Sequence, residues 1–237
     1  MIGIPILNAV ATHDWQGAEN IPPTGRVIVA SNHVSYADVL FLTHFLYAHG
    51  RAPRYIGKES LFRLPLIGRI LTAAGQIPVD RQTKDAHKAL DLGVAALEVG
   101  HLVGMYPEGT LTRDENLWPM VAKTGIARLA VMSRTAVIPV AAWGPQKVLP
   151  PYSKRVHVWP RTRVSYQAGP AVDLSPWYGR EGDPVAMAEA TALIMQTLTR
   201  MLEKMRGEVA PLLPFDPHQS NLPKTGNFKK TRRVKDQ

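Results

Sequence analysis

Residues 27–38 (VIVASNHVSYAD) constrain the fold of this chain more than any other stretch. The apolar run 27–30 predicts a short buried strand, and the polar residues that follow carry His33 and then Asp38. Open α/β sheets bind their ligands at the carboxyl ends of strands. A histidine and a carboxylate at this position therefore form a candidate base with its orienting partner. The five-residue spacing of His33 and Asp38 does not identify a function by itself, and its significance depends on the motifs in the rest of the chain.

The apolar pattern predicts an α/β fold with a mostly parallel central sheet flanked by helices, because strands alternate with helices along the chain. Strands are expected near residues 27–31, 54–57, 76–79, 101–106 and 137–142, with one or two more within 154–168. Helices are expected at residues 36–48, 85–99 and 125–133 and from Pro184 onward, whereas residues 1–25 have the composition of a loop. We expect one domain over residues 1–210 and a Pro-rich, then basic, partly disordered tail over residues 211–237.

Residues 58–74 (KESLFRLPLIGRILTAA) allow two interpretations. Pro65 is expected to break a helix here, which leaves two short apolar helices edged by cations. Such helices suit the interface of a membrane. They also suit packing against the sheet as core helices, and the sequence does not decide between the two.

Composition excludes some chemistry and indicates the class of partner. The 237 residues include no cysteine, so disulfides, thiolate metal sites and a cysteine nucleophile are excluded. The net charge is +9, and six of the last fourteen residues are Lys or Arg against one Asp. A basic chain binds polyanions such as nucleic acid, anionic membranes or phosphorylated substrates. No signal peptide and no apolar run long enough for a membrane span are visible, so any membrane contact is expected to be peripheral.

Four sequence blocks occur in an order that resembles the glycerolipid acyltransferase family. They are residues 32–38 (NHVSYAD), 75–81 (GQIPVDR), 106–110 (YPEGT) and 137–140 (VIPV). The best-known members of this family are the 1-acylglycerol-3-phosphate acyltransferases, which convert lysophosphatidic acid into phosphatidic acid. The resemblance extends over about residues 17–144. It implies a single domain of the glycerol-phosphate acyltransferase type.

The resemblance also implies the reaction, which is transfer of an acyl group from acyl-CoA or acyl-carrier protein to a lysophospholipid hydroxyl. His33 is then the general base, because neutral imidazole has a reference pKa of about 6.5 and accepts a proton near neutral pH. Asp38 can accept the other ring N–H and fix the tautomer. Ser35 lies between them, but in this family the substrate hydroxyl attacks directly, so we expect no acyl-Ser35 intermediate.

The block at residues 106–110 and the one at residues 75–81 are expected to bind the phosphate of the acceptor, as in the family. Gly109 permits close backbone approach and Thr110 offers a hydroxyl. The family's Glu-Gly-Thr-Arg is altered here, since Leu111 holds the arginine position and the next cation is Arg113. We expect Arg81 to be the main phosphate ligand with Arg113 assisting. A different acceptor head group is the alternative.

Three further residues have less specific assignments. Glu108 is expected either to hold Arg81 or Arg113 in place or to orient a backbone turn. Lys58 and Lys123 are candidate phosphate contacts, although solvated lysines fit equally well. No cluster of His, Asp and Glu has the spacing of metal ligands, so we expect no catalytic metal and no cofactor.

Residues 39–48 and 61–71 are the expected lining of an apolar slot for the acyl chain. Their cations and the basic tail are expected to hold the protein on an anionic membrane surface, at the cytoplasmic face of the cell membrane. Three alternatives stay open: another lysophospholipid or glycerol 3-phosphate as acceptor, a non-catalytic lipid-binding relative, and nucleic-acid binding. The last rests on the basic tail alone, and no nucleic acid is expected.

Overall fold

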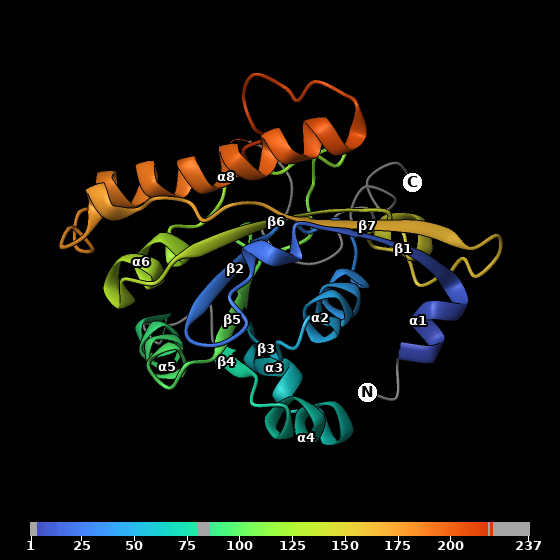
Figure 1. Ribbon diagram of the computed structural model, residues 1–237, viewed down its shortest axis with the longest axis horizontal. Coiled ribbons are helices and arrows are strands. Elements are labelled where there is room, and N and C mark those ends of the chain that lie inside the picture. The colour runs from blue at the N-terminus through green and yellow to red at the C-terminus, as the bar shows by residue number, and fades with distance from the viewer. Residues whose placement is uncertain (1–3, 80–85, 218, 220–237) are drawn as a thin grey trace, which may run out of the picture.

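The computed structural model of the chain describes residues 4–79, 86–217 and 219. Its centre is a seven-stranded sheet with the order β1-β7-β6-β2-β5-β3-β4. The strands are β1 (Ala11–Gln16), β2 (Val27–Ser31), β3 (Pro53–Lys58), β4 (Ile77–Val79), β5 (Leu102–Met105), β6 (Val137–Trp143) and β7 (Thr162–Ala168). Figure 1 shows the sheet between two layers of helices.

Five of the strands are parallel, from β6 through β2, β5 and β3 to β4. Strand β7 is antiparallel to β6, and β1 is parallel to β7, so these two strands run the opposite way at one side of the sheet. The carboxyl ends of the five parallel strands therefore lie at one edge, which we call the carboxyl edge. The expected α/β class with a mostly parallel sheet is confirmed.

The helices cover both faces of this sheet. The longer ones are α1 (Ile4–Val10), α2 (Asp38–Ala48), α4 (Pro65–Ala73), α5 (Ala86–Glu98), α6 (Gly125–Ser133) and α8 (Pro184–Arg206). Shorter ones are α3 (Glu59–Phe62), α7 (Pro145–Val148) and the 3₁₀ turns η1 (Ala18–Asn20) and η2 (Ser175–Trp177). Helix α2 packs on one face, whereas α5, α6 and α8 pack on the other, and Figure 1 shows α2 and α8 on opposite sides.

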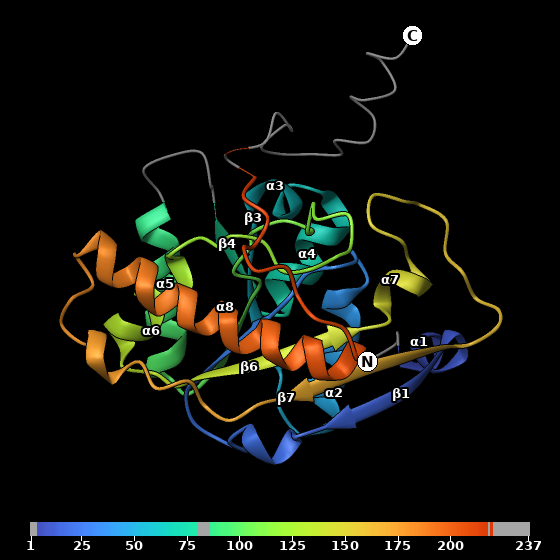
Figure 2. The ribbon, with the colours of Figure 1, turned by 90° about the horizontal axis from the view of Figure 1, so that it is seen from above.

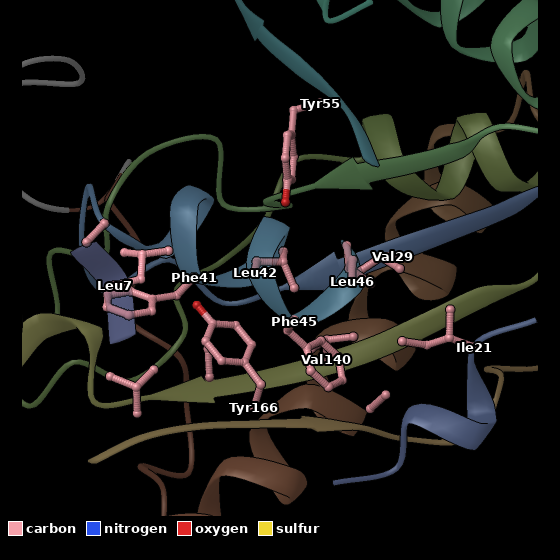
Figure 3. Packing of buried hydrophobic residues seen from close by; sticks show 14 of the residues in the cluster. Leu7, Ile21, Val29, Phe41, Leu42, Phe45, Leu46, Tyr55, Val140 and Tyr166 are labelled. Carbon is pink, nitrogen blue, oxygen red and sulfur yellow. The ribbon is translucent and has the colours of Figure 1, made fainter. Parts of the chain in front are cut away.

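Alternation along β2 sends side chains into both cores. Val27 and Val29 join the core under α2, and Ile28 and Ala30 join the core under α5, α6 and α8. All four side chains are fully buried, which is why this strand reads as a continuous apolar run. In Figure 3 the aromatic and aliphatic side chains of α2 fill the space between that helix and Val140 and Tyr166 of the sheet.

Most of the predicted elements are present with small shifts at their ends. Strand β2 and helix α6 begin and end where the sequence predicted. Asp183 caps α8 as expected, because its Oδ1 accepts hydrogen bonds from the N–H groups of Val185 (2.9 Å) and Ala186 (3.2 Å).

The prediction of a loop over residues 1–25 is wrong for residues 4–16, which form α1 and β1. Strand β1 is polar (ATHDWQ) and lies at the edge of the sheet, paired only with β7 among the described strands. An edge strand with mixed burial lacks the apolar pattern on which the prediction depends, and its pairing with residues 151 positions later cannot be seen in the local sequence.

Pro65 separates α3 from α4 and occupies the first position of α4, as its fixed φ allows. The interpretation of this region as core helices is wrong, since α3 buries none of its residues and α4 buries only Gly68. Leu66 and Ile70 are 72% and 58% exposed. None of the described helices combines the length and apolar composition that a membrane span requires.

The predicted boundary of the tail at residue 211 remains a prediction. The N–H of Val121 donates to the carbonyl of Phe215 (3.0 Å), so the first residues after α8 return to the body of the domain. Residue 218 and residues 220–237, which carry most of the basic charge of the tail, lie outside the described residues.

Candidate active site

The candidate site begins where β2 ends at the carboxyl edge. The next residue, Asn32, is buried and its side-chain amide spans to β6: Nδ2 donates to the carbonyl of Ala142 (3.0 Å) and Oδ1 accepts from its N–H (2.8 Å). The chain leaving β2 is thereby fixed to the neighbouring strand. His33 follows directly, and the carbonyl of His33 accepts the N–H of Thr112 (2.8 Å).

Asp38 is the first residue of α2 and is completely buried. Its Oδ2 lies 3.0 Å from Nδ1 of His33 and accepts the N–H groups of Val34 (2.7 Å) and Ser35 (2.8 Å). Burial raises the pKa of Asp38, and the hydrogen bond from His33 and the two backbone N–H groups oppose that rise. The contact orients the imidazole so that Nδ1 faces α2, and the His33 side chain keeps 14% exposure.

Glu108 holds the backbone of the site. This carboxylate is 3% exposed, and its Oε1 accepts the N–H of His33 (3.1 Å) while Oε2 accepts the N–H of Met120 (3.0 Å). Burial raises the pKa of Glu108 to about 8, against the lowering effect of these two bonds. These two bonds fit the expectation that Glu108 orients a backbone turn, and its alternative role of holding Arg81 or Arg113 stays a prediction.

Ser35 is tied into the structure. Its hydroxyl donates to the carbonyl of Leu149 (2.7 Å) and accepts the N–H of Ala37 (3.0 Å), and the residue is fully buried. A hydroxyl with both bonds in use and no exposure is poorly placed to attack a substrate. The expectation that Ser35 forms no acyl intermediate stays a prediction.

Tyr106 is a site residue to which the sequence analysis gave no role. Its ring stacks on the imidazole of His33, with centroids 4.2 Å apart and an angle of 23° between the planes. The ring of Tyr55 is nearly parallel to that of Tyr106, with centroids 6.2 Å apart. The hydroxyl of Tyr106 is buried without a hydrogen-bond partner among the described residues, and burial raises its pKa well above the usual value. The stack fixes the plane of the imidazole in addition to the hydrogen bond that the ring donates to Asp38.

A cavity of about 710 Å³ lies beside His33, in the size range of ligand sites. Most of its wall is apolar, with Val39, Tyr55, Ile56, Leu61, Phe62, Leu71, Val79, Leu90, Met105, Leu111 and Ile126 among the lining residues. Of the helix at residues 39–48 only Val39 lines it, because Phe41, Leu42, Phe45 and Leu46 face the core shown in Figure 3. Of residues 61–71, Leu61, Phe62 and Leu71 line the cavity, and their contact with an acyl chain stays a prediction.

The polar part of the cavity wall contains three of the residues expected to bind phosphate. Gly109, Thr110 and Lys123 line the cavity together with His33. Arg128, on α6, lines it as well, and the sequence analysis missed this cation. The signal was available, because Arg128 lies four residues after Thr124, at the start of a helix between the third and fourth motif blocks.

Arg113 does not belong to the lining of the cavity. It is 2% exposed and lies against Tyr152. Burial raises the pKa of Tyr152, and the charge of Arg113 and side-chain hydrogen bonds with Arg113 and Thr110 reduce that rise. Leu111, in the arginine position of the family motif, is 1% exposed and does line the cavity. The altered motif thus places an apolar side chain where the resemblance implies a cation.

Two expected phosphate contacts lie beyond the described part of the chain. Arg81 falls within residues 80–85, and nothing is described of the Lys58 side chain, although its backbone ends β3. Among the described residues, no three His, Asp or Glu side chains gather closely enough to hold a metal ion.

The loop that carries Met120 is held from the far end of α8. The hydroxyl of Thr112 donates to the carbonyl of Trp118 (2.6 Å), and Asp114 accepts the N–H of Trp118 (2.9 Å). The guanidinium of Arg206 lies over the Trp118 ring at 3.8 Å and over the Trp143 ring at 4.1 Å. This buried cation–π sandwich connects the last turn of α8 to the loop that carries Met120. The N–H of Met120 is the second hydrogen-bond donor to Glu108.

Comparisons with known proteins show the family and the fold that this chain resembles. A model of the family described as Acyltransferase matches residues 13–143. The chain is 30% identical over 147 residues to the chloroplastic 1-acyl-sn-glycerol-3-phosphate acyltransferase BAT2 of Brassica napus, which covers 60% of this chain and 40% of that protein. It is also 30% identical over 128 residues to the 1-acyl-sn-glycerol-3-phosphate acyltransferase of Borreliella burgdorferi, covering 54% and 49%.

Among solved structures, the chain resembles the 1-acyl-sn-glycerophosphate (LPA) acyltransferase PlsC from Thermotoga maritima. The TM-score is 0.66 at 20% identity, over 88% of this chain and 78% of that one, and this likeness concerns the fold. The chain spans about half or less of the length of the two curated relatives described above. Because the family model covers more than half of the chain, including His33, Asp38 and residues 106–113, the chain belongs to the Acyltransferase family.

Proposed function

We propose that this chain transfers a fatty acyl group from a thioester carrier, acyl-CoA or acyl-carrier protein, to the free hydroxyl of lysophosphatidic acid, giving phosphatidic acid. The observation that carries the proposal is the 3.0 Å contact between His33 Nδ1 and Asp38 Oδ2 at the wall of a largely apolar cavity. The names of the two curated relatives support the choice of acceptor.

His33 is the proposed general base. Because Asp38 engages Nδ1, Nε2 is the nitrogen that takes the proton of the acceptor hydroxyl as its oxygen attacks the thioester carbonyl. The C–O bond forms, the tetrahedral intermediate collapses with cleavage of the C–S bond, and the imidazolium returns the proton to the departing thiolate. Asp38 stabilises the imidazolium while it exists, and a positioned base of this kind contributes a rate factor of about 10²–10⁴.

The apolar wall of the cavity is the proposed site of the acyl chain. Leu61, Phe62 and Leu71 approach from α3 and α4, and Ile56 and Met105 approach from the sheet. Burial of each methylene of an acyl chain in such a slot contributes about 0.8 kcal/mol. The length of the slot would then limit the length of the acyl chain that is transferred.

The polar wall is the proposed site of the acceptor phosphate. Thr110 and Lys123 line it, and Arg128 adds a second cation. We retain Arg81 as the main ligand from the family motif, with Arg113 acting on this wall through Tyr152 and Thr110. Arg81→Ala should then raise the KM of the acceptor much more than the KM of the donor, and equal effects on both would count against this role.

Leu111 favours a second candidate acceptor. A buried leucine in the lining replaces the motif arginine, so the site has less positive charge than the family pattern implies. Another lysophospholipid, or glycerol 3-phosphate, is the alternative substrate of the same chemistry. A non-catalytic lipid-binding role has no need of the His33–Asp38 pair.

We also propose peripheral attachment to an anionic membrane at the cytoplasmic face. The exposed side chains of α4, including Leu66, Ile67 and Ile70, are flanked by Arg63 and Arg69, as in helices that lie in a membrane interface. Leu61, Phe62 and Leu71 of the same region line the cavity, so a bilayer beneath α4 would adjoin the acyl slot.

An acyl transfer assay tests the proposed function. Purified protein is incubated with acyl-CoAs of graded length and with lysophosphatidic acid, lysophosphatidylcholine or glycerol 3-phosphate, beside the His33→Ala variant. Formation of phosphatidic acid by the wild type and its loss in the variant are expected. A preference for another acceptor would establish the second candidate, and no transfer to any acceptor would contradict both.

A further inference from the structure

We propose that residues 154–161 (KRVHVWPR), with the neighbouring helix α1, form a second docking surface for an anionic lipid bilayer. We call residues 154–161 the tryptophan loop. The inference rests on the proposed function, because the bilayer is then the source of the acceptor lipid. It concerns a different part of the chain from α4 and the basic tail.

The tryptophan loop exposes apolar side chains to an unusual degree. Trp159 is 84% exposed, and Val156 and Val158 are 55% and 56% exposed. Single exposed apolar residues are common on protein surfaces, but three within four positions, one of them a tryptophan, are typical of an interaction site.

The loop is held in this position by hydrogen bonds to main-chain carbonyls. His157, between the two valines, donates its N–H to the carbonyl of Val148 (2.8 Å), and its Nδ1 lies 3.0 Å from the carbonyl of Lys147. At the other end, Arg161 donates to the carbonyls of Asn8 (2.7 Å) and Ala11 (2.8 Å). The loop is thereby fastened to α7 on one side and to the α1–β1 junction on the other, while the valines and Trp159 face solvent.

The topology brings this loop to the edge of the sheet that carries His33. Strand β6 ends at the carboxyl edge, and the antiparallel β7 begins there, so the connection between them lies at that edge. Helix α1 precedes β1, which is parallel to β7, and therefore lies at the same edge with Ile6 65% exposed. Figure 2 shows the connection reaching outward near α7 and α1.

The start of the same connection touches the cavity wall. Tyr152 packs edge-on against Tyr36 with centroids 6.4 Å apart, and Tyr36 lines the cavity. Residues 153–161 continue from this contact without an intervening element. The loop is thus connected to the proposed acceptor site through two aromatic side chains.

Charge and residue type favour a bilayer over a protein partner. Lys154, Arg155 and Arg161 contribute three positive charges within eight residues that include no Asp or Glu. Tryptophan prefers the boundary between headgroups and acyl chains, and Lys and Arg beside it bind anionic headgroups. Stable attachment requires two signals, and the tryptophan loop would supply one in addition to α4.

The test measures binding to vesicles by co-sedimentation with the full chain. Vesicles of phosphatidylcholine mixed with phosphatidylglycerol are compared with vesicles of phosphatidylcholine alone. The variant Val156→Ser/Val158→Ser/Trp159→Ser should bind the mixed vesicles at least about tenfold more weakly than the wild type, because its apolar contact area is lost. Its acyl transfer to a short-chain, monomeric acceptor in solution should stay within about twofold, since none of the three residues lines the cavity.

A matched control separates the loop from exposed valines in general. Val99 and Val185 are 71% and 64% exposed elsewhere on the surface, so Val99→Ser/Val185→Ser repeats the substitutions of Val156→Ser/Val158→Ser at similar exposure. The control pair should leave vesicle binding unchanged, whereas the loop pair should weaken it severalfold.

Three results would overturn the docking surface: no binding of the wild type to mixed vesicles, wild-type binding by the loop variant, or equal loss in the control pair. Transfer of acyl groups by the wild type would still stand in each of these cases. Loop-dependent vesicle binding without acyl transfer to any acceptor would support the docking surface and contradict the proposed function.

Discussion

Two buried carboxylates, Asp38 and Glu108, approach the same histidine from different motif blocks and hold different parts of it. Asp38 contacts the ring at Nδ1, whereas Glu108 accepts the backbone N–H of His33 and that of Met120. Both are almost completely buried, and burial raises the pKa of each. Asp38 therefore contacts the imidazole ring, and Glu108 contacts the backbone that carries the ring.

Because both carboxyl groups contact His33, removal of the imidazole should have the largest effect. His33→Ala should lower kcat/KM by about 10³ or more, because the proposed general base is lost. The assay is acyl transfer from acyl-CoA to lysophosphatidic acid. His101→Ala is the control, since His101 precedes β5 at the opposite edge of the sheet and should leave activity unchanged.

Asp38→Asn tests the carboxylate that contacts the ring. The neutral amide cannot stabilise the imidazolium and can favour the wrong tautomer, so kcat should fall by about 10²–10⁴ with little change in KM. Steady-state kinetics in both substrates measure this split. Asp14→Asn, which removes a carboxylate paired with Arg163 on the sheet edge, should not affect kcat. A larger change in KM than in kcat would contradict the proposed role of Asp38 in orienting the imidazole ring.

Glu108→Gln tests the carboxylate that contacts the backbone, and its main effect should be on stability. The new amide nitrogen cannot accept the N–H of His33 or of Met120, whereas each oxygen of the Glu108 carboxyl group can. At about pH 4.5 this should lower the free energy of unfolding by about 1–3 kcal/mol. Activity should fall less than in Asp38→Asn, because the ring keeps its partner. Chemical unfolding followed by tryptophan fluorescence measures the loss.

The difference in the free energy of unfolding between the wild type and Glu108→Gln should depend on pH. The pKa of Glu108 is about 8 in the folded chain, against a reference of 4.5. Between these values the folded state binds the extra proton, so the contribution of Glu108 to stability is present below pH 4.5 and is lost as pH rises to about 8. The wild type should lose up to about 1.4 kcal/mol per pH unit relative to Glu108→Gln. A difference that grows in favour of the wild type would reverse this sign.

Ser35→Ala should have the smallest effect on activity. The hydroxyl bonds the Leu149 carbonyl and the Ala37 N–H, so its loss should reduce the free energy of unfolding by about 1 kcal/mol and leave kcat within a few-fold. Thermal unfolding measures the loss in stability, and the acyl transfer assay measures kcat. Detection of an acyl group on Ser35 by mass spectrometry after mixing with acyl-CoA would contradict the proposed direct attack.

Local patterns predicted the parts of the fold that local forces determine. The buried run at residues 27–31 and the helical spacing at residues 125–133 need no knowledge of distant partners. Strand β1 could not be predicted this way, because its polar residues are ordered by pairing with β7. Pro65 correctly divided α3 from α4, but sequence could not show that α4 leaves its apolar face exposed.

The candidate site was predictable to the extent that it lies within the motif blocks. His33 and Asp38 are five residues apart at the end of a strand, and their contact follows from short-range geometry. The backbone role of Glu108 depends on Met120, twelve residues later, and the stack of Tyr106 depends on the packing of two strands. The position of Arg113 could not be predicted from the motif. The motif led us to expect this cation at the acceptor phosphate, but its side chain is buried beside Tyr152.

The sandwich of Arg206 between Trp118 and Trp143 has a consequence for how this domain can be divided. The family model ends at residue 143, yet the loop that supplies Met120 to Glu108 is fastened by a guanidinium 63 residues further along the chain. A polypeptide cut at the end of the family model would leave two tryptophans without their cation and β6 without its β7 neighbour. The segment that the family model matches is therefore shorter than the segment that these contacts join.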